Sequence, residues 1–294
     1  MGITHSTARW LAPLSLVVNM SSQAYGMLTT PNMQDIHEAN VSFFSPHPAF
    51  IGAFFTSQQI FQLMWLYHLC RPNSRGRLSF LRNTDPNNQD IEDDLSLMVD
   101  YAPYYTLGNF CIAAWCPLWV SSNLTLAFAP VALNTIIQLY YLFIRLPSLP
   151  HKSAIYPGSS LPKSTIMNLS STSSFLTHVV IKTFAGISIL DFIHNGSLVF
   201  FNHGMAVSNM TKVLTGLGFA TLTLAGGKSS DFIFGGSLVY DLAGLAVGQR
   251  VYGNVEWSKM LGIYAGATGL MVGLKNMLWW PYARRSGEGY ETLR

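Results

Sequence analysis

The sequence predicts an all-α membrane protein, a bundle of about eight transmembrane helices with both termini in the cytoplasm. Composition is the first observation behind this prediction. Only 11% of the 294 residues are charged and 49% are hydrophobic, whereas soluble domains average roughly 25% charged residues. The mean hydropathy is positive, at +0.28. A chain with so few charges cannot cover its apolar residues with a polar surface, so we expect most of it to lie in a bilayer.

Long apolar segments are the second observation. A helix that crosses a bilayer needs about 20 mostly apolar residues. Eight segments meet this requirement, although polar residues interrupt the first and the sixth is short. They are residues 10–29, 47–70, 102–121, 124–146, 175–201, 211–227, 231–249 and 260–280. We expect loops between them, the longest at 71–101.

The distribution of Lys and Arg is the third observation, because cytoplasmic loops carry an excess of both. With eight spans, thirteen of the seventeen basic residues fall on the side of the two termini. Three fall on the opposite side, and Lys182 lies within a span. A miscount by one helix would abolish this asymmetry, so the charges support eight spans.

The loop lengths predict two groups of four helices, residues 1–146 and 175–280. Residues 147–174 are rich in Pro and Ser and are typical of a flexible cytoplasmic linker. Residues 281–294 would form a short cytoplasmic tail. The chain has no polar stretch long enough for a separate soluble domain.

The sequence lacks the motifs of several enzyme classes, so we do not expect an ATPase, a metalloprotease or a serine hydrolase. The three cysteines form no CxxC pair and no metal-ligand spacing. There is no ATP-binding loop, no metal-binding helix motif and no nucleophile elbow. No basic run suits nucleic acid. We therefore expect no metal, no cofactor and no nucleic-acid partner, and the lipid bilayer is the first partner that the sequence implies.

Two glycosylation motifs lie in loops on the non-cytoplasmic side, at Asn40 (NVS) and Asn209 (NMT). N-linked glycans are added at such positions in secretory membranes. If the chain is eukaryotic, the motifs predict a glycoprotein of the secretory pathway, in the endoplasmic reticulum or the plasma membrane.

The last span contains glycines four or three residues apart, at Gly262, Gly266, Gly269 and Gly273. Small residues at this spacing allow helix backbones to approach closely. The pattern fits either an ordinary contact within the chain or a seam between two copies of it.

Ionisable residues inside the predicted spans are the strongest functional signal. Residues 178–201 (HVVIKTFAGISILDFIHNGSLVFF) contain Lys182, Asp191 and His194, and the seventh span contains Asp241. A charge at the bilayer centre costs about 2.5–3.5 kcal/mol on insertion scales, so such groups face a partner or a wet cavity. Lys182 could instead extend to the headgroups. The two aspartates either form hydrogen bonds between helices or belong to a cavity site.

Two short segments resemble the tryptophan-rich, TspO-type (translocator protein) family. In NFCIAAWCPLW (109–119), Asn109, Trp115, Pro117 and Leu118 match one motif of that family, and SPHPAFIGAFF (45–55) approximates its proline-aromatic helix start. DFIFGGSLVYDLAGLAVGQ (231–249) is similar to the penultimate helix of larger relatives of the family. The resemblance implies a flat apolar ligand, such as a tetrapyrrole or a sterol, bound between helices.

We therefore expect a helix-lined cavity that binds or carries an apolar small molecule of sterol-, terpenoid- or tetrapyrrole-like kind. Trp115, Trp119 and Tyr140 would form flat walls, and His194 and Lys182 would add polarity. Asp191 and Asp241 are the candidate proton donors for the alternative function, a membrane-embedded cyclase or isomerase that uses a buried Asp as general acid. A structural scaffold is the third possibility.

Overall fold

The computed structural model describes residues 4–71, 86–148, 171–201, 207–225 and 232–288, and within them the side chains of all residues except 86–94 and 279–288. This part of the chain is all-α, as predicted. Its nine α-helices are α1 (His5–Leu28), α2 (Met33–Ala39), α3 (Pro48–Cys70), α4 (Pro86–Val120), α5 (Leu124–Tyr140), α6 (Thr172–Phe200), α7 (Asn209–Ala225), α8 (Phe232–Val251) and α9 (Val255–Glu288). A π-helical turn (Tyr141–Arg145) and a 3₁₀ turn (Leu146–Ser148) continue α5.

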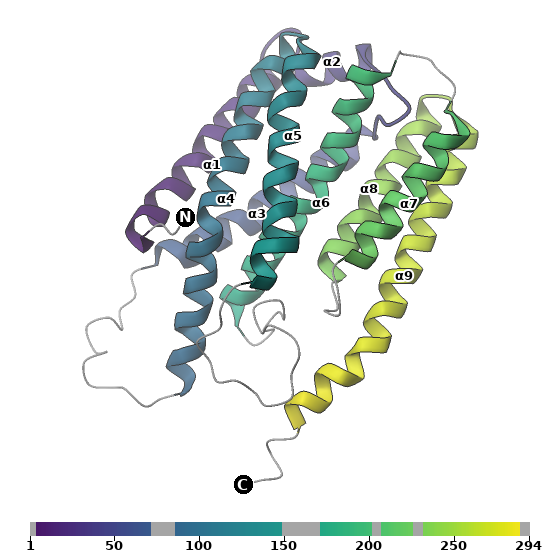
Figure 1. The fold of residues 1–294 in the computed structure, drawn as a ribbon. Coiled ribbons are helices and arrows are strands. Elements are labelled where there is room, and N and C mark those ends of the chain that lie inside the picture. Colours follow the sequence, from purple (N-terminus) through teal and green to yellow (C-terminus); the bar gives the residue numbers. More distant parts are fainter. Residues whose placement is uncertain (1–3, 72–85, 149–170, 202–206, 226–231, 289–294) are drawn as a thin grey trace.

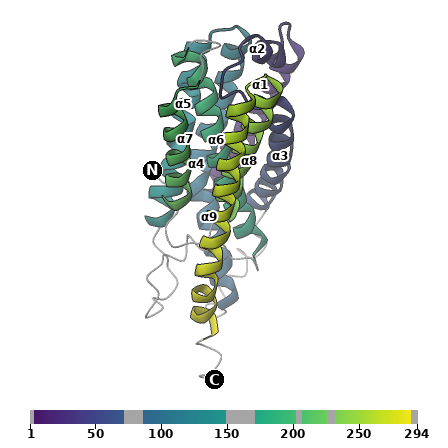
Figure 2. The same cartoon turned by 90° about the vertical axis from the view of Figure 1, so that its right-hand side faces the viewer.

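The eight long helices form one elongated bundle in which successive helices run in opposite directions (Figure 1). The start of α1 and the end of α9 point to the same end of the bundle, and the short α2 lies at the other end. The helices α7, α8 and α9 pack together on one side (Figure 2). Each predicted span corresponds to one long helix, and α2 is an additional helix between the first two.

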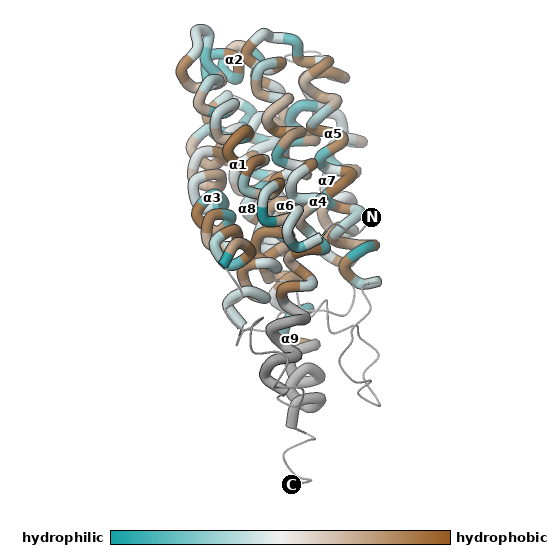
Figure 3. The backbone as a smooth tube through the Cα atoms, turned by 90° about the vertical axis from the view of Figure 1, so that its left-hand side faces the viewer, coloured by the Kyte–Doolittle hydropathy of each residue, from teal (hydrophilic) through white to brown (hydrophobic). Residues whose placement is uncertain are grey.

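In the described part of the chain, three helical segments are both long and apolar enough to cross a membrane: α5 with its continuation (Leu124–Ser148), α6 (Thr172–Phe200) and α8 (Phe232–Val251). Hydrophobic residues extend along the helices over much of the length of the bundle (Figure 3). Large apolar side chains are also exposed on its outer faces, for example Leu14 on α1 and Leu270 on α9. Exposed apolar surface of this extent is typical of a face that contacts lipid.

Helix α6 occupies the centre of the bundle. Twenty of its 29 residues are buried, and it packs against α3, α4, α5 and α8. A helix that is apolar around its whole circumference buries every face, so it belongs in a core. The polar residues that α6 carries are therefore enclosed by other helices.

The predicted loop 71–101 is shorter than expected, because α4 begins at Pro86. Proline is favoured at the first position of a helix. The next turns contain Met98, Tyr101, Ala102 and Tyr105, all with at most 1% of their surface exposed. This spacing of three and four residues is that of one buried helix face. The acidic residues before this buried face are typical of a loop, so the sequence predicts a loop as far as residue 101.

Helix α9 also continues beyond the predicted end of the last span, to Glu288. At three of its glycines, Gly262, Gly266 and Gly273, an added Cβ would meet no atom of the described chain within 4 Å, and at Gly269 it would meet only Val239, at 3.8 Å. These glycines therefore do not serve a close contact between helices of the same chain. A seam between two copies stays a prediction.

The segment before α3 is held against α8 and α9 by hydrogen bonds to its backbone. The Nε2 of Gln249 donates to the carbonyls of Ser42 and Ser45, over 2.9 and 3.1 Å, and the Nε1 of Trp257 donates to the carbonyl of Phe43 over 2.7 Å. Gly248 lies directly against this segment, and an added Cβ would come within 2.5 Å of the Ser45 carbonyl oxygen. The start of α3 is thereby fixed in position.

We predict that Gly248→Ala destabilises the fold, because backbone atoms cannot give way to the added methyl group. Overpacking of this kind costs about 1–3 kcal/mol. The matched control is Gly236→Ala in the same helix, where nothing lies within 4 Å and alanine favours the helix. The measurement is the thermal unfolding midpoint in mild detergent. A midpoint for Gly248→Ala at or above that of Gly236→Ala would contradict this packing.

Candidate functional site

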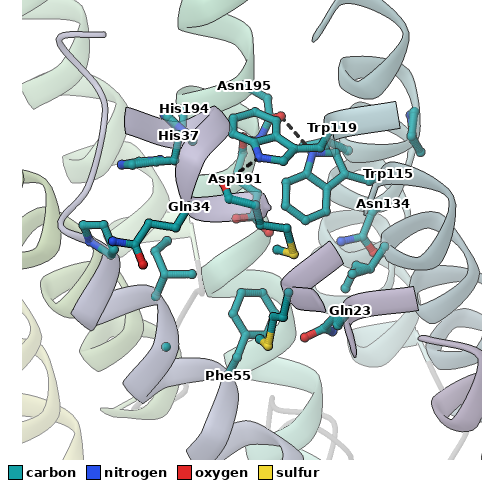
Figure 4. Close-up of a pocket in the computed structure, with 18 of the residues that line it drawn as sticks. Gln23, Gln34, His37, Phe55, Trp115, Trp119, Asn134, Asp191, His194 and Asn195 are labelled. Atoms are coloured by element: carbon teal, nitrogen blue, oxygen red, sulfur yellow. Dashed lines mark hydrogen bonds between the residues drawn. The ribbon is translucent and has the colours of Figure 1, made fainter. Parts of the chain in front are cut away.

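A cavity of about 480 Å³ lies in the half of the bundle next to α2 (Figure 4). Residues from all of the first six helices line it. Its volume is within the range of about 300–1,000 Å³ that is usual for small-molecule sites. Apolar side chains such as Ile51, Phe55, Ile112 and Val131 form much of the lining.

One side of the cavity is a continuous row of rings from α4, α6 and α2, which we call the aromatic wall. The ring centroids of Trp115 and Trp119 are 5.3 Å apart. The ring of Trp119 lies 5.8 Å from that of His194, and His194 lies 5.1 Å from His37. Trp115 and Trp119 share this wall because residues four apart lie on one face of a helix.

Hydrogen bonds fix the indole groups of the aromatic wall. The Nε1 of Trp115 donates to Oδ1 of Asn195 over 3.0 Å, and the Nε1 of Trp119 donates to the carbonyl of Met33 over 3.1 Å. The Nδ2 of Asn195 in turn donates to the backbone carbonyl of Asp191 over 2.9 Å. Because both indole N–H groups are already bonded, the two tryptophans can offer a ligand only their ring faces and edges.

Asp191 differs from its polar neighbours because its carboxyl group has no hydrogen-bond or ion-pair partner in the described part of the chain. Its side chain is half-buried, lines the cavity and lies beside the aromatic wall (Figure 4). The two ring nitrogens of His194, one turn further along α6, also have no partner there. A buried polar group without a partner is costly, so within the cavity lining these are groups that a ligand could supply with a partner.

Other polar groups near the cavity are bonded in a chain across three helices. The Nε2 of Gln23 donates to Oδ1 of Asn19 over 2.9 Å, and the Nδ2 of Asn19 donates to Oδ1 of Asn109 over 2.7 Å. Asn109 then donates to the Tyr105 carbonyl over 2.9 Å. The hydroxyl of Tyr105 donates to Oε1 of Gln62 over 2.9 Å. This chain joins α1, α3 and α4.

A second polar cluster joins α4 to α5. The hydroxyl of Tyr101 donates to Oε1 of Gln138 over 2.9 Å, and the Nε2 of Gln138 is 3.3 Å from Oδ1 of Asn134, which lines the cavity. Gly108 allows this approach, since an added Cβ would lie 2.5 Å from the Gln138 Nε2. The cluster therefore holds a second wall of the cavity.

Helix α2 covers the end of the cavity. It begins with a capping box, in which Oδ1 of Asn32 accepts from the backbone N–H of Asp35 and Oδ2 of Asp35 accepts from that of Asn32. The Nε2 of His37 lies 2.9 Å from the hydroxyl of Tyr252, which follows α8. Burial is the main cause that lowers the pKa of His37, and the nearby Glu38 opposes it. The imidazole is therefore neutral at pH 7.

Four of the seven residues predicted for a ligand or catalytic site line the cavity: Trp115, Trp119, Asp191 and His194. Tyr140 does not line it; its side chain is 45% exposed and stacks on Tyr104 at 6.2 Å. Lys182 is buried, with 4% of its surface exposed, so it neither lines the cavity nor extends to the headgroups.

Asp241 is completely buried in α8 and does not line the cavity. Neither of its carboxyl oxygens has a hydrogen-bond partner among the described residues. Of the two aspartates predicted for the site, Asp191 is therefore the one that a molecule in the cavity can reach.

The predicted site did not include two features of the cavity lining, the amide side chains and the residues of α2. Gln23, Gln59, Asn134 and Asn195 line the cavity, and His37 completes the aromatic wall. The sequence does contain an indication of the amides, because several of them recur within segments whose other residues suit lipid. Amides inside spans indicate contacts between helices, since lipid offers them no hydrogen-bond partner.

The cavity has an exposed rim between α1 and α3. Met27 of α1 is 65% exposed, and Gly52 and Thr56 of α3 are exposed as well. The two helices contact each other near their opposite ends, where the Nε2 of His5 lies 3.2 Å from the carbonyl of Leu69. The exposed part of the lining therefore includes residues of α1 and α3.

The two glycosylation motifs lie at the α2 end of the bundle. Asn40 is half-buried, and its Nδ2, the atom that would carry a glycan, donates to the carbonyl of Ile36 over 2.8 Å. Asn209 is exposed at the first residue of α7. Accessibility thus favours Asn209, and glycosylation of either residue stays a prediction.

No protein-family model, no curated protein and no solved structure matches this chain. The resemblance to the TspO-type family therefore stays a prediction that rests on the short motifs alone. Any inference about function has to come from the geometry of the cavity.

We predict that Asp191→Asn leaves the thermal midpoint of the purified protein unchanged or higher, since the carboxyl group has no partner to lose. Asn109→Leu is the comparison, because it interrupts the polar chain and leaves Asn19 without its acceptor. Such a loss costs about 1–3 kcal/mol. If Asp191→Asn destabilised the protein as much as Asn109→Leu does, Asp191 would be a structural residue rather than part of a site.

Proposed function

We propose that this chain is a multipass membrane protein with eight spans and cytoplasmic termini, and that its cavity binds or carries an apolar small molecule. The alternating directions of the eight long helices and the excess of Lys and Arg on one side support this topology. A sterol-, terpenoid- or tetrapyrrole-like molecule has the apolar, flat character that the lining favours.

The observation that carries the proposal is the combination of the aromatic wall with Asp191. Apolar cavities with a few convergent polar groups are the usual form of a small-molecule site. An intramembrane carboxyl group is costly to keep there, and such groups generally serve function. The resemblance to the TspO-type family agrees with this proposal, since Trp115 belongs both to the matching motif and to the aromatic wall.

The rim between α1 and α3 supports entry of the molecule from the bilayer. An apolar compound is concentrated in the hydrocarbon layer, so an opening toward lipid spares it a passage through water. In this proposal Met27, Gly52 and Thr56 form the entrance. Their exposed positions face the bilayer once the eight helices span it.

The test is a mass spectrum of small molecules extracted from the protein purified in mild detergent, beside a mock preparation. We expect a non-phospholipid compound in stoichiometric amount. Gly52→Trp should reduce that amount, because the indole fills the entrance. Gly218→Trp on α7 is the matched control, since both glycines have open space around them. If wild type contains only bulk phospholipid, the cavity holds no tight ligand and the proposal fails.

A second candidate function is proton-transfer catalysis by a membrane-embedded cyclase or isomerase. The carboxyl group of Asp191, which has no described partner, favours it. A protonated carboxylic acid held against an apolar substrate is a competent general acid, and ring faces such as those of Trp115 and Trp119 stabilise positive charge. Asp241 does not line the cavity and would act only through Asp191.

Comparison of binding with turnover distinguishes the two functions. A general acid that becomes an amide cannot donate its proton, so Asp191→Asn should abolish conversion of a bound compound while the compound still binds. A binding protein or carrier should show no conversion in either form. The readout is the ratio of substrate to product among the molecules that copurify with wild type and variant.

A further inference from the structure

The charge lining the cavity restricts the kind of molecule that it can accept. Among the described residues that line it, Asp191 is the only one with an acidic side chain, and none is Lys or Arg. His37 is neutral at pH 7, as its lowered pKa requires. A lining with one carboxyl group and no Lys or Arg among its described residues favours a ligand that brings a positive charge or a hydrogen-bond donor.

The remaining polar groups of the cavity are largely used within the protein. The amides of Gln23, Asn134 and Asn195 each take part in a hydrogen bond to another side chain. Both indole N–H groups of the aromatic wall are bonded as well. The carboxyl group of Asp191 and the ring nitrogens of His194 are thus cavity groups without a described partner, and of these only the carboxyl group can carry a negative charge.

The aromatic wall also favours a positively charged ligand. A cation within about 6 Å of a ring face is attracted by the ring quadrupole, most strongly by tryptophan. Trp115 and Trp119 lie beside Asp191 in the cavity (Figure 4). A carboxylate and ring faces in one apolar site together form the arrangement that recognises an ammonium group.

We propose that the ligand is an apolar molecule with a protonated amine at one end, which binds Asp191 while its body lies along the aromatic wall. This inference rests on the proposed function, since it requires that the cavity takes a small molecule. It narrows the range of ligands, because a ligand with ionised carboxylates, such as an acidic tetrapyrrole, would meet Asp191 with like charge and find no Lys or Arg among the described residues of the lining.

The experiment compares three probes that share one compact hydrocarbon body and differ in the head group: 1-aminoadamantane, 1-adamantanol and adamantane-1-carboxylate. Dissociation constants are measured by titration calorimetry on the full chain in mild detergent at pH 7. We expect the amine to bind at least about tenfold more tightly than the alcohol, as is typical of a hydrogen bond to a charged group. The carboxylate should bind least well.

Two variants test the assignment to Asp191. Asp191→Asn should bring the affinity for the amine down to that for the alcohol, while the affinity for the alcohol stays unchanged and shows that the cavity is intact. Glu38→Gln is the matched control, because Glu38 is an exposed carboxylate on α2 that does not line the cavity. It should keep the preference for the amine.

The possible failures separate the two proposals. If the alcohol binds wild type as tightly as the amine, or if Asp191→Asn keeps the preference for the amine, the amine inference is overturned and the apolar cavity of the proposed function stands. If none of the three probes binds wild type, both are overturned.

Discussion

The cost of burying polar groups in a low-dielectric bundle is the constraint on which this structure depends. Every buried amide or hydroxyl that lacks water must find its partner in the protein. The bundle meets much of this demand with hydrogen bonds between helices, such as that from Asn19 to Asn109 and that from Trp115 to Asn195. These bonds fix the helices in register and shape the cavity. Asp191 is one of the described exceptions, and unlike Asp241 it lines the cavity, where a molecule from outside could supply a partner.

The central position of α6 links this constraint to function. A helix that packs on all sides cannot turn its polar residues toward lipid, so Asp191 and His194 must face the other helices or a space between them. The hydrogen bonds that fix the segment before α3 and the cap that starts α2 then hold that space open. Exposed lining residues on α1 and α3, such as Met27 and Gly52, are the proposed entrance for a compound from the bilayer.

The sequence allows correct prediction of those features that depend on one helix at a time. Composition and apolar runs predict the all-α class, and spacing within a helix places Trp115 with Trp119 and Asp191 near His194. Features that depend on the register between helices are not predictable in this way. Periodicity does not reveal which neighbour Tyr140 meets, or that Asp241 points away from the cavity. The acidic stretch before Met98 favours a loop prediction, because its charge outweighs the buried face that follows.

The most direct test of this site is an experimental density map of the full chain in lipid nanodiscs, determined by electron cryo-microscopy without added ligand. We expect a cavity bounded by the aromatic wall, with non-protein density between the ring of Trp119 and the carboxyl group of Asp191. A map in which side chains fill this space, or in which Asp191 bonds to another side chain of the protein, would contradict the proposed site.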